Sequence, residues 1–148
     1  MTIRRPMMFA LPLLGWKEYV AFPRLGLGPL VAKIDTGART AALHADEIHV
    51  SGRRVRFSIR DDHGRLHWYR APLAGYKRVK SSNGISQLRP VIRATIELGG
   101  KSLKAEITLT DRTDMGVPML LGRATINGHF IVHPGKTFLL SRKRKTVT

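Results

Sequence analysis

Two segments joined by a pair of glycines constrain the fold of this chain most. In the first segment, residues 91–98, the apolar positions alternate with polar ones and are Ile92, Ala94, Ile96 and Leu98. Residues 102–109 alternate in the same way after Gly99 and Gly100. A period of two is typical of a β-strand with one buried face, and Gly-Gly between two such strands favours a tight turn. We therefore predict an antiparallel hairpin here.

The remainder of the chain also reads as short strands. Further hairpins are predicted in "IHVSGRRVRFSI", turning at Ser51 and Gly52, and in "FSIRDDHGRLHWYR", turning near residues 62–64. The segments "GWKEYVAF" and "PLVAKID" indicate two more strands, linked by the Gly-rich "PRLGLG". A helix of at most one or two turns follows Gly122. Many short strands with frequent turns indicate an all-β sandwich or barrel-like domain.

A length of 148 residues suits one domain, which we place at residues 15–140. It is preceded by an apolar N-terminal arm, residues 1–14, and followed by a basic polar tail, residues 141–148. The arm begins somewhat like a signal peptide, but it lacks an Ala-x-Ala-like site and Pro12 interrupts its apolar run. We expect it to pack on the domain or on a partner subunit.

The charge balance points to anionic partners. The chain has 26 Lys and Arg against 10 Asp and Glu, a formal net charge of +16. Such a surface attracts nucleic acid, ribosomes, anionic membrane or an acidic peptide. The chain has no cysteine, which excludes disulfides, thiolate catalysis and cysteine-type zinc sites, and which fits a reducing cytoplasm.

One of the few acidic residues ends an apolar strand, in "AKIDTGART". Asp35 emerges where the strand ends, Thr36 can fix the turn, and Gly37 allows another backbone or a substrate to approach closely. A carboxylate that activates water needs such a rigid and exposed support. The alternative is that Asp-Thr-Gly forms only a turn.

A second segment, "VPMLLGRATING", places Leu120 and Leu121 before Gly122 and Arg123. Asp-Thr-Gly-Ala followed by apolar-apolar-Gly-Arg resembles the retropepsin-like aspartic proteases. The chain resembles more closely the bacterial RimK-associated retropepsin-like peptidases, also called putative ATP-dependent zinc proteases, from Gly15 to about Val132. The segments that carry the resemblance are "GWKEYVAFP", "AKIDTGARTAALHA", "RPVI", "LTDR" and "PMLLGR".

This resemblance implies a cytoplasmic protein with a retropepsin-like fold, an all-β closed barrel or sandwich with a flap hairpin and little helix. It implies a peptidase that trims the glutamate tails which RimK-type ligases add to a ribosomal protein. The implied catalytic residues are Asp35, Thr36 and Gly37. The implied active-site scaffold is Leu120, Leu121 and Gly122. The candidate substrate-binding residues are Ala38, Arg39, Thr40, His44, Arg123 and, where the resemblance places the flap tip, Ser82, Asn83 and Gly84.

An aspartic peptidase needs two carboxylates that share one proton. Because the chain has one Asp-Thr-Gly, we expect a homodimer in which each subunit contributes Asp35. The alternative is a monomer whose second carboxylate is Asp111 or Asp114, in "LTDRTDM".

Arg39 and Thr40 stand where the retroviral enzymes usually carry acidic residues. An arginine beside the catalytic carboxylate can bind a glutamate side chain with two hydrogen bonds, which suits an acidic substrate. The alternative is that Arg39 only pairs with Asp46, Glu47 or the backbone of the chain.

The sequence predicts no metal and no cofactor. It has no His-Glu-x-x-His string, and its two His-x3-His pairs, His63/His67 and His129/His133, fall on a turn and a predicted strand, which do not suit shared ligation. His44 remains a possible substrate or metal contact, so a metal-dependent peptidase is an alternative. "GGKS" at residues 99–102 lacks the first glycine of a P-loop.

The competing class is a basic RNA-binding or ribosome-binding module without catalysis. Its candidate phosphate contacts are Arg53, Arg54, Arg56, Lys77, Arg78, Lys80 and residues 142–145, and its candidate stacking residues are Trp16, Trp68, Tyr69 and Tyr76. No recognised RNA-binding motif is present.

Overall fold

The computed structural model describes residues 10–80, 83–113 and 115–141 of the chain. The residues outside this description are 1–9 of the predicted arm, 81–82 (Ser82 of the predicted flap tip among them), Asp114 and 142–148 of the predicted tail. The described elements, in chain order, are β1 (Leu13–Gly15), β2 (Lys17–Phe22), β3 (Leu27–Ile34), β4 (Ala41–His44), β5 (Glu47–Ser51), β6 (Arg54–Arg60), β7 (Leu66–Pro72), β8 (Gly75–Lys80), β9 (Ser86–Leu98), β10 (Lys101–Thr110), β11 (Met119–Leu121), α1 (Arg123–Ile126) and β12 (Ile131–His133).

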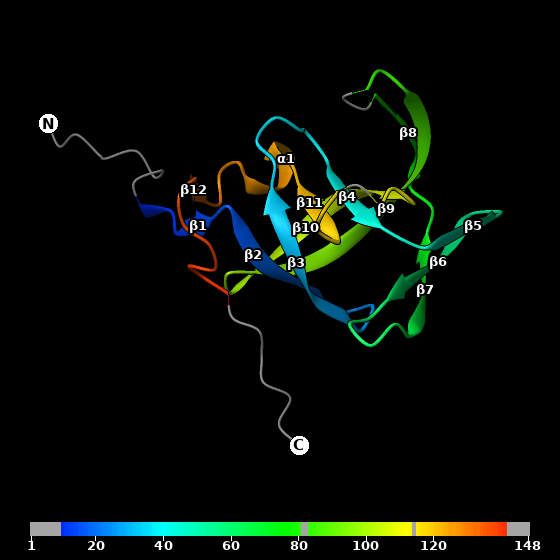
Figure 1. Cartoon of the computed structure of the whole chain (residues 1–148), viewed down its shortest axis with the longest axis horizontal. Helices are drawn as coiled ribbons and strands as arrows, with labels where there is room; N and C mark the ends of the chain where they lie inside the picture. The colour runs from blue at the N-terminus through cyan, green and yellow to red at the C-terminus, as the bar shows by residue number, and fades with distance from the viewer. Residues whose placement is uncertain (1–9, 81–82, 114, 142–148) are drawn as a thin grey trace, which may run out of the picture.

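Six strands form a closed barrel, which confirms the predicted all-β class with little helix (Figure 1). The strand order is β10-β4-β11-β3-β2-β9, and pairing between β9 and β10 closes the ring. The interior is filled by side chains that alternate along these strands, among them Phe22, Leu43, Ile96, Ile107 and Leu121. Closure removes free edges from most of the sheet.

The predicted hairpin around Gly99 and Gly100 is confirmed. Leu98 pairs with Lys101, and the two glycines have φ angles of 57° and 80°, which suit a two-residue turn between strands. β9 is longer than predicted, because it begins at Ser86. Its first half pairs with β8 and its second half with β10, so the β8–β9 hairpin projects from the barrel (Figure 1).

The other two predicted hairpins are also confirmed, as the pairs β5–β6 and β6–β7. The two strands predicted on either side of "PRLGLG" are β2 and β3, which pair antiparallel. Strands β5, β6 and β7 form a separate three-stranded sheet beside the barrel (Figure 1). One face of this sheet packs Val55, Phe57 and Ala71 into the core. Its other face carries exposed residues, Trp68 among them.

A buried carboxylate fixes the last described residues of the chain to the barrel. Glu18 on β2 is fully buried and accepts hydrogen bonds from the backbone N–H groups of Gly15, Leu139, Leu140 and Ser141. The Ser141 hydroxyl also donates to it, at 2.6 Å. These five donors satisfy the oxygens of the buried Glu18 side chain.

β1 pairs in parallel with β12, and Leu14 on β1 is fully buried. The division into arm, domain and tail stays a prediction. The only helix in the described part of the chain, α1, is far too short to cross a membrane.

Candidate active site

Asp35 follows the last residue of β3 and is held there by β11. Strand β11 lies between β3, to which it is parallel, and β4, to which it is antiparallel. The backbone N–H of Asp35 donates to the carbonyl of Leu121 at 2.8 Å. Leu120 and Leu121 pair with Lys33 and Ile34 and so extend the sheet to the position of Asp35; their role as active-site scaffold stays a prediction.

The turn after Asp35 orients its carboxylate. Gly37 N–H donates to Asp35 Oδ1 at 3.1 Å, and Ala38 N–H donates to the Asp35 carbonyl at 3.2 Å. A Cβ atom at Gly37 would lie 3.3 Å from the same Oδ1. Asp35 is half-buried while Thr36 and Gly37 are exposed, so the carboxylate is fixed and also accessible.

Gly122 and Arg123 connect the two motifs. The backbone N–H groups of Arg123 and Ala124 donate to the carbonyls of Ala38 and Arg39, at 2.8 and 2.9 Å. A Cβ atom at Gly122 would lie 2.5 Å from the Thr40 carbonyl oxygen, so this position requires glycine for its space. Arg123 Nη1 donates to the Thr36 carbonyl at 2.8 Å, which gives this predicted substrate-binding residue a role in shaping the turn.

Two depressions flank Asp35. One is lined by Asp35, Thr36, Arg39, Arg123, Asn127 and Phe130, among others. The other is lined by Asp35, Thr36, Lys33, Arg112, Met115 and Leu120, among others. Both contain cationic side chains, so an anionic group beside Asp35 meets favourable charge. Sequence reasoning missed Lys33 and Arg112; Arg112 lies in the quoted segment "LTDR", only one residue after Asp111.

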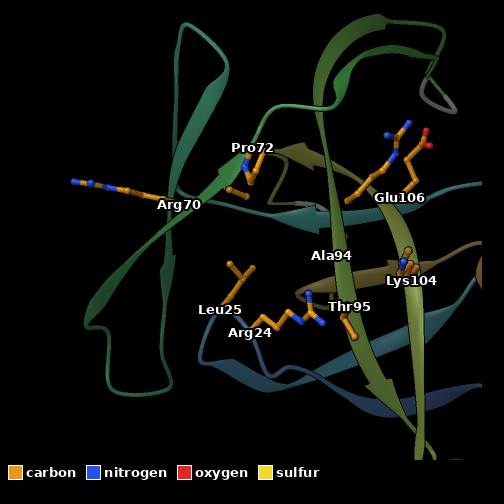
Figure 2. Close-up of a pocket in the computed structure, with 11 residues that line it drawn as sticks. Arg24, Leu25, Arg70, Pro72, Ala94, Thr95, Lys104 and Glu106 are labelled. Carbon is orange, nitrogen blue, oxygen red and sulfur yellow. The ribbon is translucent and has the colours of Figure 1, made fainter.

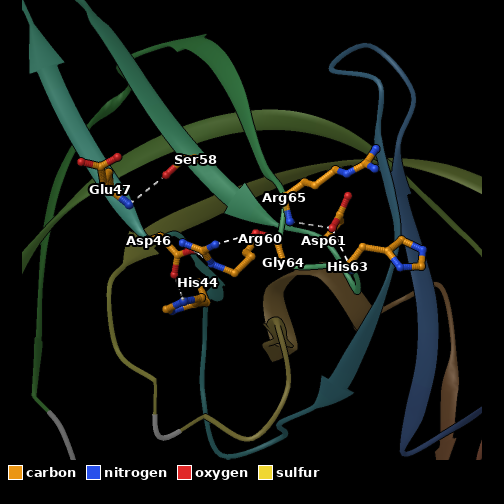
Figure 3. A network of polar contacts seen from close by, with 9 residues as sticks. All are labelled: His44, Asp46, Glu47, Ser58, Arg60, Asp61, His63, Gly64 and Arg65. Carbon is orange, nitrogen blue, oxygen red and sulfur yellow. Dashed lines mark hydrogen bonds and ion pairs between the residues drawn. The ribbon is translucent and has the colours of Figure 1, made fainter.

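The Arg39 side chain is exposed and lines the first depression. Asp46 forms its ion pair with Arg60, Nε to Oδ2 at 3.2 Å, and also contacts His44 (Figure 3). Glu47 lies 4.0 Å from His49. In the described residues neither carboxylate forms an ion pair with Arg39. The alternative that Arg39 only pairs with Asp46 or Glu47 is therefore wrong.

His44 lies at the end of β4, and its Nε2 is 3.2 Å from Asp46 Oδ1 (Figure 3). Its Nδ1 is buried and has no hydrogen-bond partner among the residues that the structure describes. His44 lines neither depression at Asp35. The structure therefore places this predicted contact in the network with Asp46 and Arg60. In the described part of the chain no three His, Asp or Glu side chains are grouped so that they could hold a metal ion.

The predicted flap corresponds to the β8–β9 hairpin. Of its predicted tip, Asn83 and Gly84 are described; Asn83 Oδ1 accepts from Ile85 N–H at 3.2 Å, and Gly84 has a φ of 85°. A further depression is lined by Asn83, Ile85, Gln87, Arg89, Asp111 and Arg112. It shares Arg112 with one of the depressions at Asp35, so a depression lined by flap residues adjoins the candidate site.

Asp111 belongs to this flap-side depression. Gln87 Nε2 donates to Asp111 Oδ1 at 3.4 Å. Asp111 lines neither of the depressions that contain Asp35, and Asp114 lies outside the described residues. Arg89 also lines this depression; it is 4% exposed and donates through Nε to Gln87 Oε1 at 3.0 Å. No local sequence pattern singled it out.

Comparison with known proteins gives two kinds of relative. A probable alpha-L-glutamate ligase of Shewanella pealeana is 36% identical over 138 residues, which is 88% of this chain and 30% of that protein. A probable alpha-L-glutamate ligase of Parasynechococcus marenigrum is 34% identical over 129 residues, 82% of this chain and 28% of that protein. The chain thus spans less than a third of the length of these curated relatives.

The crystal structure of Lpg0085, a protein with unknown function from Legionella pneumophila, superposes with a TM-score of 0.72 and 30% identity. The match covers 88% of this chain and 98% of that one. A family model described as RimB-like, retropepsin-like aspartic endopeptidase RimB, matches residues 13–143. The chain therefore belongs to the RimB-like family of retropepsin-like aspartic endopeptidases.

Proposed function

We propose that this protein is an aspartic-type peptidase that hydrolyses peptide bonds in acidic, glutamate-rich tails, with Asp35 as its catalytic carboxylate. Its family supports the peptidase class. The observation that carries the proposal is the position of Asp35. Leu121 and Gly37 hold it by hydrogen bonds, and it opens onto depressions that contain Arg39, Arg112 and Arg123.

Hydrolysis requires a second carboxylate, which in this proposal is Asp35 of a second copy of the chain across a two-fold axis. Two adjacent carboxylates share one proton, because like charges at close range cannot both ionise. The ionised carboxylate takes a proton from water, whose oxygen attacks the peptide carbonyl carbon. The protonated carboxyl donates to the carbonyl oxygen, and collapse of the intermediate transfers a proton to the leaving amine.

Two observations support an acidic substrate. The first is the cationic lining beside Asp35, in which Arg39 is free of the carboxylates of Asp46 and Glu47 in the described residues. The second is that the chain matches part of two probable alpha-L-glutamate ligases, proteins named for a reaction of glutamate. A shared chain would keep synthesis and removal of glutamate tails together. We place this activity in the cytoplasm, on a tail carried by a ribosomal protein.

The test is mass spectrometry of two peptides, one ending in six glutamates and one ending in six glutamines. Wild type, Asp35→Asn and wild type with a chelator are compared. Loss of glutamate residues by wild type, with or without chelator, supports the proposal when Asp35→Asn is folded and inactive. Loss that the chelator abolishes supports the metal-dependent alternative. No cleavage by folded wild type contradicts the proposal.

Mixing wild type with Asp35→Asn tests the dimer. When two subunits supply the two carboxylates, a heterodimer is inactive and activity falls with the square of the wild-type fraction. When Asp111 or Asp114 of the same chain supplies the second carboxylate, activity falls linearly. The two curves differ by a factor of two in an equal mixture.

The second candidate function, RNA or ribosome binding, is favoured by the exposed face of the β5–β7 sheet. Arg56 lies 4.5 Å above the Trp68 ring, whose residue is 43% exposed, and His49 stacks on the same ring. Exposed aromatic rings among cations suit single-stranded RNA. Such binding would be unchanged in Asp35→Asn, reduced in Trp68→Ala, and weakened by salt.

A further inference from the structure

Strand β9 has a gap in its hydrogen-bonded edge. On one side it pairs with β10 along residues 91–98. On the other side it pairs with β8 as far as Val91 and with β2 only at Glu97. Arg93 and Thr95 lie in the gap between these two partners.

The backbone groups of Arg93 and Thr95 point into this gap. The Val91 carbonyl accepts from Ala74 N–H at 2.7 Å on the same side, and alternate residues of a strand direct their N–H and C=O groups to the same edge. Within the described residues, Arg93 and Thr95 make no backbone hydrogen bond there. Unpaired groups of this kind are a template for another strand.

A second open edge faces the gap. β7 pairs only with β6 in the described structure, and Leu73 N–H donates to the Arg53 carbonyl at 2.8 Å. The backbone groups of Arg70 and Pro72 therefore point away from β6. Residues of β7 and of β9 line one pocket, with Arg24 and Leu25 of the β2–β3 turn between them (Figure 2). This pocket, which we call the edge slot, contains no residue that lines the depressions at Asp35.

The edge slot is cationic. Arg24, Arg93 and Lys104 are exposed residues of its lining, and none forms an ion pair in the described residues. The Arg70 side chain points away from it (Figure 2). The single carboxylate of the lining, Glu106, is already bound by Lys77, Nζ to Oε1 at 2.6 Å. That hydrogen bond lowers the pKa of Glu106, and Arg93 adds to the effect.

We propose that the edge slot binds an extended, carboxylate-rich peptide by strand addition to β9. The peptide backbone pairs with Arg93 and Thr95, its carboxylates meet Arg24, Arg93 and Lys104, and its methylene groups contact Leu25 and Ala71. Among the described residues, the lining contains no aromatic side chain on which a nucleobase could stack, which favours a peptide over RNA. This binding goes beyond the proposed hydrolysis and does not require Asp35.

The test uses the full chain carrying Asp35→Asn, so that a fluorescent hexaglutamate peptide is not consumed. Fluorescence anisotropy gives its Kd, and nuclear magnetic resonance follows the backbone amides. We expect shifts and slower hydrogen exchange at the amides of Arg93 and Thr95. Arg24→Ala and Lys104→Ala should each raise Kd about threefold to tenfold, the range for a partly exposed charge-assisted contact.

Two matched pairs of variants separate strand addition from general attraction. Thr95→Pro removes one N–H from the open edge while leaving the β10 side intact, and should raise Kd about tenfold, whereas Thr95→Val should change it less than twofold. Arg65→Ala removes an exposed charge outside the slot, and should also change Kd less than twofold.

Several results would overturn the proposal. Equal effects of Arg65→Ala and Arg24→Ala would show attraction by net charge alone. Amide shifts confined to Thr36 and Gly37 would place the peptide at Asp35. Displacement of the peptide by an equal concentration of hexauridylate would show an RNA site. Circular dichroism checks that Thr95→Pro is folded. If it is unfolded, the amide shifts of Arg93 and Thr95 in the Asp35→Asn protein test strand addition instead, and their absence would overturn the proposal. The cleavage assay with wild type is a separate readout, so failure there leaves this binding result standing.

Discussion

The backbone N–H of Asp35 donates to the carbonyl oxygen of Leu121 across 2.8 Å. This bond joins the Asp-Thr-Gly segment to the apolar-apolar-Gly-Arg segment, which are far apart in the sequence. The Arg123 and Ala124 N–H groups then return to Ala38 and Arg39. The position of the carboxylate therefore depends on both segments.

Gly122→Ala should destabilise the fold. The added Cβ would lie 2.5 Å from the Thr40 carbonyl oxygen and from backbone atoms of Arg39, which have no room to move. We expect a loss of about 2–4 kcal/mol in the free energy of unfolding, at or above the usual cost of overpacking. Urea denaturation measures it, and an unchanged midpoint would contradict the close approach.

Gly37→Ala should leave the fold stable and slow catalysis. Its Cβ would lie 3.3 Å from Asp35 Oδ1, which must move by a few tenths of an ångström. Because small displacements of a reacting group are costly, we expect kcat to fall about tenfold with a similar KM. Steady-state kinetics on the glutamate peptide test this. A change in KM alone would show that Gly37 acts on substrate binding.

Arg39→Glu should weaken binding of acidic substrates. It reverses the charge of an exposed side chain that lines the same depression as Asp35. We expect KM for the hexaglutamate peptide to rise about tenfold, in line with a partly screened charge reversal. Arg65→Glu makes the same change of charge elsewhere on the surface and serves as the control. Equal effects of the two variants would assign the preference to net charge.

Glu18→Gln should destabilise the protein although it conserves shape. One of the two acceptor oxygens becomes an NH2 group that faces backbone donors from residues 139–141. We expect a loss of about 2–4 kcal/mol, because a buried donor is left unsatisfied and charge-assisted bonds are lost. Thermal and urea unfolding measure it. Glu97→Gln, at an exposed position, should have no such effect.

Asp61 should contribute to stability only above its folded pKa. A hydrogen bond from His67 at 2.7 Å, together with the backbone N–H groups of Arg65 and His63, lowers the pKa of Asp61 from 3.8 to about 2. A depressed folded pKa means that its contribution is complete above pH 4 and is lost as pH falls towards 2. Wild type should therefore lose more stability in this interval than Asp61→Asn. Acid titrations of wild type and Asp61→Asn, followed by circular dichroism, measure the difference. Unfolding curves of the same shape for both proteins would contradict this prediction.

Local sequence patterns predicted the barrel hairpins well, because alternation and turn glycines act within a few residues. They missed the first five residues of β9. Pro90 interrupts the pattern there, yet it pairs with Tyr76 at a position where no ladder hydrogen bond to β8 is required. The resemblance to a family supplied the link between Asp35 and Leu121, since no local pattern shows which strands will lie side by side.

Features that depend on distant contacts were not predicted. Glu18 shares a strand face with Val20 and Phe22, and a carboxylate on an apolar face was the available signal. Arg112 lay in the segment "LTDR", but its place beside Asp35 depends on a distant contact. The gap in β9 gave no signal, because it depends on where separate hairpins end. The predicted grouping of His44 with the catalytic residues rested on closeness in sequence, whereas β4 carries it to Asp46.

The Glu18 contacts also have a consequence for synthesis of the chain. Glu18 and Leu139, which meet through a 3.0 Å hydrogen bond, are separated by 121 positions. The ribosome makes Glu18 and its Gly15 donor long before it makes the other backbone donors, in residues 139–141. During translation water must therefore take the place of these late donors at the Glu18 carboxylate. Docking of residues 139–141 then becomes a late step of folding, because Glu18 gains these donors only after residue 141 has left the ribosome.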